Sequence, residues 1–236
     1  YNFGSALEEL NELEQAEKFY NKLIDLDQKV FGENHPTTGI NYNLLSYFYH
    51  TAGNYPLALE YANKAIAIHQ QHAPYSGYEY VESLFNKTHA LKALSRPREA
   101  IESLLKAEQV FDSFLPAGHS SYVNLYNGLG VLYKHIAQFE KGTDYFTKAL
   151  DIGLVQKSTD QTDIASIYGN LGNIAIEQQD YEKAELLYRK RHKIRVAIYG
   201  EKSRQGLGRS RILGSKGQQY KESNKAGHEM GKNAQD

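Results

Sequence analysis

Two segments of this sequence contain residue types that could support metal or phosphate chemistry. His69 and His72 of HQQH stand three residues apart, which places them on one face of a helix at a spacing that can bind a metal ion. No third ligand lies nearby, and zinc sites need three or four, so we expect both histidines at the surface and no metal site. The segment GLGRSRILGSKG (206–217) departs from the phosphate-binding pattern GxxxxGK[ST], because Ser215 precedes Lys216.

The residue types needed for most catalytic centres are missing. The chain has no Cys, which excludes thiolate nucleophiles, disulfides and Cys-ligated zinc. Neither a GxSxG nor an HExxH motif occurs. We therefore expect no catalytic residue, no metal and no cofactor, and hence a protein that is not an enzyme.

The composition predicts a folded protein of the cytoplasm. Of the 236 residues, 41% are hydrophobic, which is enough for a sizeable core. No apolar run approaches the roughly 18 residues of a membrane span, no signal peptide is recognisable, and the absence of Cys is typical of a reducing compartment. Because the chain begins at Tyr1 without methionine, we expect it to be part of a longer protein.

Basic residues are concentrated towards the end of the chain. The net charge is −1, but the residues from Leu187 onward carry +9 and leave −10 for the rest. One predicted helix carries a basic cluster of five residues: Arg189, Lys190, Arg191, Lys193 and Arg195. The cluster could bind nucleic-acid phosphates, an acidic partner or another copy of the chain, or it could be a solvated helix face. The −10 on the remaining chain would repel a duplex and argues against nucleic acid.

An internal repeat of 42 residues runs through the sequence. One column of small residues recurs at that interval: Ala16, Ala58, Ala100, Gly142 and Ala184. A second column lies seven residues later: Leu23, Ala65, Ala107, Ala149 and Arg191. A third lies twelve residues before the first: Gly4, Ser46, Thr88, Gly130 and Gly172. Small residues at fixed positions allow two helices to cross closely, so each repeat is predicted to be an antiparallel helix pair. In the fourth repeat the break is expected around residues 135–138.

The segment FGENHP (31–36) is predicted to be the turn between two repeats. Gly32 suits the left-handed position after a helix, and Pro36 suits the first turn of the next helix. A related segment, YGEKSR (199–204), begins 168 residues later, which is four repeats. A third relative is LPAGHS (115–120), in which His119 matches His35.

These columns resemble the tetratricopeptide repeat (TPR). The fullest match consists of Tyr126, Leu129, Gly130, Tyr133, Phe139, Gly142, Phe146 and Ala149. The usual period is about 34 residues, and a period of 42 with this turn is similar to the kinesin-light-chain subclass. The resemblance implies an all-α fold, a right-handed α-α superhelix or solenoid of about five helix pairs. The five repeats would cover residues 1–199, the first truncated at its N-terminus, and the basic, glycine-rich residues 200–236 would form a degenerate sixth repeat or capping helix.

In TPR proteins the first helix of each pair lines a concave groove that binds a peptide or partner segment. The columns expected to face this groove contain Asn2, Asn43, Tyr47, Asn86, His89, Lys92, Asn124, Asn127, Lys134, His135, Asn170 and Asn173. Asn offers both a donor and an acceptor, so the asparagines could form a ladder that pairs with the backbone of an extended peptide, or they could only solvate the groove. Tyr47, His89 and Lys134 would then set specificity. Most tyrosines are expected in the core, with Tyr47 and Tyr78 as candidates for ligand contact.

The resemblance therefore implies a non-enzymatic scaffold for protein–protein interaction. Three alternatives stay open at this point. The chain could be a regulatory domain that senses a signalling peptide, an auxiliary module of an enzyme, or a nucleic-acid-binding protein that uses the basic cluster.

Overall fold

The computed structural model describes residues 13–72, 77–156 and 160–200, and helices are the regular secondary structure of these residues. The chain divides into two compact units, residues 1–138 (unit 1) and residues 139–236 (unit 2). The prediction of an all-α repeat fold is confirmed. The predictions for Asn2, for Gly4 and for a capping helix after residue 200 lie outside the described residues. The sense of the superhelix and the 1–199 boundary stay predictions.

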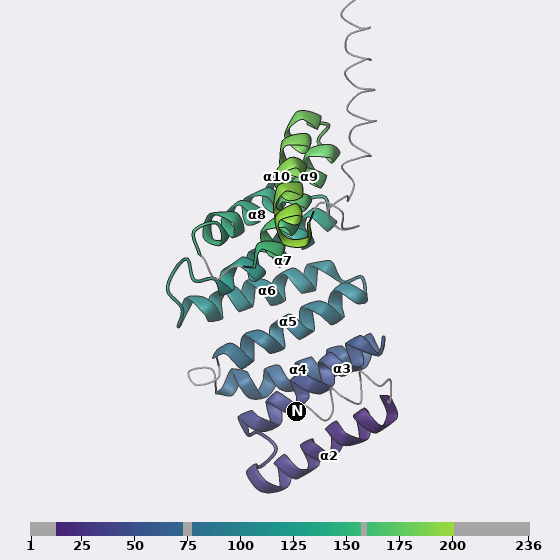
Figure 1. Cartoon of the computed structure of the whole chain (residues 1–236). Helices are drawn as coiled ribbons and strands as arrows, with labels where there is room; N and C mark the ends of the chain where they lie inside the picture. Colours follow the sequence, from purple (N-terminus) through teal and green to yellow (C-terminus); the bar gives the residue numbers. More distant parts are fainter. Residues whose placement is uncertain (1–12, 73–76, 157–159, 201–236) are drawn as a thin grey trace, which may run out of the picture. The chain divides into compact units, whose positions relative to one another are not determined.

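Unit 1 contains six described helices: α2 (Leu13–Phe31), α3 (Pro36–Thr51), α4 (Tyr55–Gln71), α5 (Gly77–Ala93), α6 (Pro97–Asp112) and α7 (Ser121–His135). Each helix packs against the next, and α3 also contacts α5 (Figure 1). In the 42-residue register, α3, α5 and α7 are the first helices of their pairs. The contact between α3 and α5 therefore joins the first helices of neighbouring pairs.

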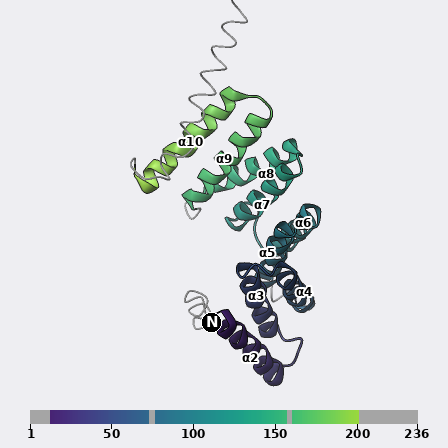
Figure 2. The same ribbon diagram turned by 90° about the vertical axis from the view of Figure 1, so that its right-hand side faces the viewer.

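Unit 2 contains α8 (Phe139–Gly153), α9 (Gln161–Glu177) and α10 (Tyr181–Tyr199). Helix α9 packs against both α8 and α10, and Figure 2 shows α9 and α10 as an antiparallel pair joined by a short turn. The predicted break at residues 135–138 is confirmed, since α7 ends at His135 and α8 begins at Phe139.

The small-residue columns lie where paired helices approach each other. Ala16, Ala58, Ala100 and Ala184 have no exposed surface. Across the α3–α4 pair, the hydroxyl of Ser46 donates a 2.8 Å hydrogen bond to the carbonyl oxygen of Ala58. The two backbones must be close for a side chain as short as serine to bridge them.

The turn between α2 and α3 has the predicted form. Gly32 is left-handed with φ +95°, and Gly200, four repeats later, has φ +78°. The structure adds a role for the recurring histidine of this turn. The backbone N–H of Thr37 donates to Nδ1 of His35 at 3.2 Å, and that of Ser121 donates to Nδ1 of His119 at 3.3 Å. Each histidine thus accepts a hydrogen bond from a backbone N–H that has no partner within its helix.

The turns within the pairs share a left-handed residue that the sequence does not reveal. Gly53, Ser95, Ala137 and Gln179 recur every 42 residues and have φ between 58° and 78°. Three of the four are not glycine, although this conformation is costly for a residue with a Cβ atom. The turn geometry is therefore set by the helix pair rather than by the identity of the turn residue.

The expectation that His69 lies at the surface is wrong. Its side chain is fully buried in α4, where Gly39 of α3 makes room for it. A Cβ atom on Gly39 would lie 2.6 Å from Nε2 of His69. Burial lowers the pKa of His69, which keeps the imidazole neutral in the core. Among the described residues no group of three or more His, Cys, Asp or Glu could hold a metal ion.

Candidate functional site

The residues predicted to line the groove lie on the first helices of the pairs. In unit 1 five of them are exposed, namely Tyr47 of α3, His89 and Lys92 of α5, and Asn124 and His135 of α7. Tyr47 is 58% exposed, and Tyr78 at the start of α5 is 53% exposed, so both candidates for ligand contact are accessible. We call the surface formed by Tyr47, Glu82, Phe85, His89 and Asn124 the first-helix face.

Two of the predicted groove asparagines bond to the protein's own backbone. Asn43 is buried, and its Nδ2 donates to the carbonyl oxygen of Glu79 at 3.3 Å. In return, Nδ2 of Asn86 donates to the carbonyl oxygen of Asn43 at 3.3 Å. These reciprocal hydrogen bonds connect α3 and α5. One amide N–H of each side chain is therefore used within unit 1.

The other groove asparagines differ in their surroundings. Oδ1 of Asn173 accepts a hydrogen bond from the hydroxyl of Tyr188. Oδ1 of Asn127 is buried without a hydrogen-bond partner. Asn124 is exposed, and Asn170 is half-buried. The ladder stays a prediction, and the exposed Asn124 is its member best placed to meet a ligand.

Basic side chains occupy the far end of the first-helix face. The ring of His89 lies 5.8 Å from that of His50. Although His89 keeps exposed surface, loss of hydration lowers its pKa, and Lys92 and His50 add to this. Lys134 of α7 is half-buried, and desolvation lowers its pKa as well.

A cleft of about 400 Å³ opens on the first-helix face between α5, α6 and α7. It is lined by Tyr78, Glu79, Val81, Glu82, Phe85, Phe111, Ser121 and Asn124. Tyr78 belongs to an edge-to-face aromatic group with Phe111 and Phe114, with ring centroids 6.4 and 5.0 Å away. The cleft thus combines an aromatic floor with two carboxylates, and none of its described lining residues is a cation. Sequence reasoning found Tyr78 and Asn124 but missed the rest.

The carboxylates give this cleft an unfavourable concentration of negative charge. Loss of hydration raises the pKa of Glu82, and the neighbouring Glu79 raises it further. Both effects disfavour the charged form of Glu82. A cation placed in the cleft would favour the charged form, because its attraction offsets the repulsion by Glu79.

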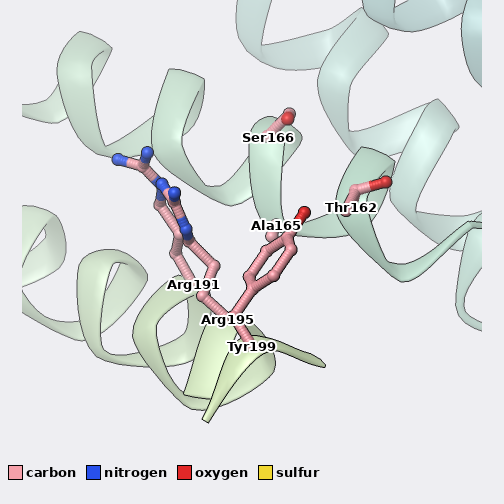
Figure 3. A pocket seen from close by; sticks show the side chains of 6 residues that line it. All are labelled: Thr162, Ala165, Ser166, Arg191, Arg195 and Tyr199. Carbon is pink, nitrogen blue, oxygen red and sulfur yellow. The ribbon is translucent and has the colours of Figure 1, made fainter. Parts of the chain in front are cut away.

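In unit 2 the structure separates the members of the basic cluster. Arg189 pairs with Glu185 on its own helix at 2.7 Å. Lys190 lies over the ring of Tyr168, with Nζ 5.5 Å from the centroid, and Lys193 is exposed. Arg191 and Arg195 instead extend in the same direction from α10 into a shared pocket (Figure 3).

This basic pocket, of about 150 Å³, lies between α9 and α10. It is lined by Thr162, Ala165, Ser166, Arg191, Arg195 and Tyr199. The ring of Tyr199 is directed toward Ala165 on the facing helix (Figure 3). The described residues of the lining contribute two guanidinium groups and three hydroxyl groups but no carboxylate.

The cleft of unit 1 and the basic pocket of unit 2 occupy the same register of the repeat. Four residues lining the pocket, Thr162, Ala165, Ser166 and Arg195, stand 84 residues after four residues lining the cleft. Those four are Tyr78, Val81, Glu82 and Phe111. Repeats three and five therefore carry a pocket at the same position with opposite charge.

Comparisons with known proteins agree with the repeat architecture. A family model described as "Tetratricopeptide repeat" matches residues 1–71 and 121–195. A solved structure, BtubC (BKLC) from P. vanneervenii, is 21% identical with a TM-score of 0.76, over 84% of this chain and 78% of that one. This likeness supports the fold.

Two relatives match parts of longer proteins. A Clustered mitochondria protein homolog of Meyerozyma guilliermondii is 24% identical over 172 residues, which are 73% of this chain and 14% of that protein. The protein KINESIN LIGHT CHAIN-RELATED 1 of Arabidopsis thaliana is 23% identical over 150 residues, 63% of this chain and 24% of its own length. The chain thus spans a small part of the length of these relatives. None of the described helices is long and apolar enough to cross a membrane.

Proposed function

Because the chain belongs to the tetratricopeptide repeat family, and its relatives include kinesin-light-chain-like proteins, we propose that it is a non-enzymatic scaffold that binds a partner polypeptide. Repeats of this family generally serve protein–protein interaction. The proposed site is the first-helix face of unit 1, with the cleft between α5, α6 and α7 at its centre.

The lining of the cleft carries this proposal. Its volume of about 400 Å³ lies in the range of ligand sites, which are concave and mostly apolar with a few polar groups. Tyr78 and Phe85 offer aromatic surface, and Asn124 offers both a donor and an acceptor at the rim. Tyr47 and His89 extend the same face along α3 and α5.

The charge of the cleft selects a cationic side chain as its occupant. A guanidinium or ammonium group is attracted to aromatic faces and to carboxylates, and Tyr78, Glu79 and Glu82 provide both. Lysine and arginine also carry apolar stems that suit Val81 and Phe85. The proposed ligand is therefore a segment of a partner polypeptide with Lys or Arg beside apolar residues.

A matched pair of labelled peptides tests the proposal with the full chain. Gly-Leu-Arg-Leu-Gly is expected to bind measurably by fluorescence anisotropy, and Gly-Leu-Glu-Leu-Gly is expected not to. The variant Glu82→Gln should weaken binding of the arginine peptide about tenfold, as expected for loss of a charge-assisted hydrogen bond. Its control is Glu102→Gln, because Glu102 is exposed on α6 and lies outside the cleft.

Two results would count against this function. Equal binding of the arginine and glutamate peptides would show that the cleft does not select its ligand by charge. An equal loss of affinity in the Glu82 and Glu102 variants would show that overall charge, and not the cleft, attracts the peptide.

A further inference from the structure

The basic pocket of unit 2 has a composition that suits a different ligand from that of the cleft. We propose that the pocket between α9 and α10 binds the phosphoryl group of a phosphorylated polypeptide. This site is separate from the first-helix face of unit 1, and its existence does not depend on the function proposed for that face.

The donors of the pocket match a phosphoryl group in charge and number. Arg191 and Arg195 stand four residues apart on one face of α10, so both guanidinium groups reach the same space (Figure 3). A phosphoryl group carries a charge of about −1.5 to −2 at neutral pH and three acceptor oxygens. Each guanidinium presents a planar fork of N–H donors that pairs with such oxygens in two parallel hydrogen bonds. Among the described residues, the lining contains no carboxylate that would compete with the ligand.

Arg191 of α10 has room for its large side chain because the facing residue on α9 is small. Its column contains alanine in the three preceding repeats, at Ala65, Ala107 and Ala149. On the facing helix, Gly169 stands where those repeats have Asn43, Phe85 and Asn127. A Cβ atom on Gly169 would lie 3.1 Å from Cδ of Arg191. Repeat five thus has a small residue on α9 where the others have a large one, and the freed space contains an arginine.

The neighbouring cations do not share this pocket. Arg189 pairs with Glu185, and Lys190 lies over Tyr168, so the two positive charges that meet in the pocket come from Arg191 and Arg195. A nucleic-acid surface would instead use the whole basic cluster as a row of phosphate contacts. The separation of the cluster therefore favours one localised anion.

The size of the pocket favours a small ligand. Its volume is about 150 Å³, compared with about 400 Å³ for the cleft of unit 1. A compact anion such as a phosphoryl group suits this space.

Titration of the full chain with N-acetylphosphoserine amide, followed by NMR of the backbone and arginine side-chain N–H groups, tests the proposal. Saturable shifts are expected at Arg195, Arg191 and Ser166. The variant Arg195→Ala should weaken binding about tenfold or more, since it removes a charge-assisted donor pair. The control Lys193→Ala removes the same charge from an exposed position on α10 and should leave the affinity within about twofold.

Parallel titrations distinguish the phosphoryl group from other anions. N-acetylglutamate amide should bind at least about tenfold more weakly than the phosphoserine probe, because it carries one negative charge. Equal affinity for the two probes would overturn the assignment to a phosphoryl group. An equal loss of affinity in the Arg195 and Lys193 variants would show that a diffuse basic surface, and not the pocket, binds the anion. Tight binding of a short RNA that depends on both residues would show the same.

Discussion

At the scale of single residues, His69 shows how burial overrides a surface-like sequence pattern. It is fully enclosed, and its ring lies against Gly39 of α3. An imidazole in such a site is disfavoured as a cation. Burial is the main cause of the lowered pKa, and His72 adds to it, while Glu79 and the backbone of Gly39 oppose it.

The first prediction concerns the pH dependence that follows from this burial. The pKa of an unfolded histidine is about 6.5, and that of His69 in the folded chain is lower. Between these values the unfolded state binds more protons, so stability falls as the pH drops below about 6.5. The variant His69→Leu should lose this part of the pH dependence and gain stability relative to the native chain between about pH 7 and pH 5, in urea denaturation at each pH.

The control for this prediction is His135→Gln, because His135 is exposed at the end of α7. Its stability curve should follow that of the native chain. If the His69 variant and the native chain gave parallel curves of unfolding free energy against pH, the predicted role of His69 would be wrong.

At the scale of helices and turns, each turn within a helix pair contains one residue with a left-handed backbone conformation. Some residue types suit this conformation better than others. Gly53 and Ala137 occupy equivalent left-handed positions in the turns that follow α3 and α7. A residue with a Cβ atom loses about 1–2 kcal/mol in this conformation, whereas glycine does not. Glycine also has more conformational freedom in the unfolded chain, which offsets part of the gain.

The second prediction is that exchanging these turn residues has opposite effects. Ala137→Gly should raise the free energy of unfolding by about 0.5–1 kcal/mol, and Gly53→Ala should lower it by about 1 kcal/mol. Both values come from urea denaturation followed by circular dichroism at 222 nm. Changes of the same sign in the two variants would contradict a shared turn conformation.

The third prediction concerns the exchange of side-chain size between α9 and α10. Gly169→Asn restores the residue found in repeats two and four, but its side chain would collide with Arg191 and should cost about 1–3 kcal/mol. Arg191→Ala restores the alanine of the other repeats and should recover at least about 1 kcal/mol of that loss when combined with it. A double-mutant cycle in urea measures this coupling. Additive effects would show that the two positions do not act on each other.

The sequence predicts elements well where a residue type recurs and poorly where a contact is made by the backbone. The small columns, the break between α7 and α8 and the left-handed Gly32 all follow from repetition. The burial of Asn43 could not be predicted, because its partner is the carbonyl oxygen of Glu79, which any residue would supply. The departures of Gly169 and Arg191 from their columns were visible, but their contact became apparent only when the two helices were placed face to face.

The cleft was missed for a related reason. Glu82 and Phe85 stand in columns that hold different residue types in the other repeats, so alignment by repetition gave them no weight. The two pockets could have been suspected from the columns that contain Glu82 and Ser166, or Phe111 and Arg195.

At the scale of the whole molecule, the uneven charge is the dominant electrostatic feature. The residues before Leu187 carry −10 and those from Leu187 onward carry +9, while the net charge is −1. Near the isoelectric point of about 6.8, overall repulsion between copies is weak, and oppositely charged parts of different copies attract each other.

The fourth prediction is therefore salt-dependent self-association. Sedimentation velocity at neutral pH should show larger species in about 0.02 M salt that dissociate in about 0.5 M salt, where screening acts over a few ångströms. Replacing Arg189 and Lys193, two exposed cations of the basic cluster, with glutamate should weaken the association at low salt. Sedimentation that is independent of salt would show that charge asymmetry does not bring copies together.

The shared register of the cleft and the basic pocket has a consequence for how such a chain can evolve. The four lining positions that correspond between repeats three and five differ in chemistry while the helix boundaries around them keep their spacing. Under the two proposals, the change from a cleft for cations to a pocket for anions needs substitutions at these positions and one exchange in a packing column, where Arg191 replaces alanine. The preferred partner can therefore change among related proteins through substitutions in single helix pairs, while the helix boundaries are kept.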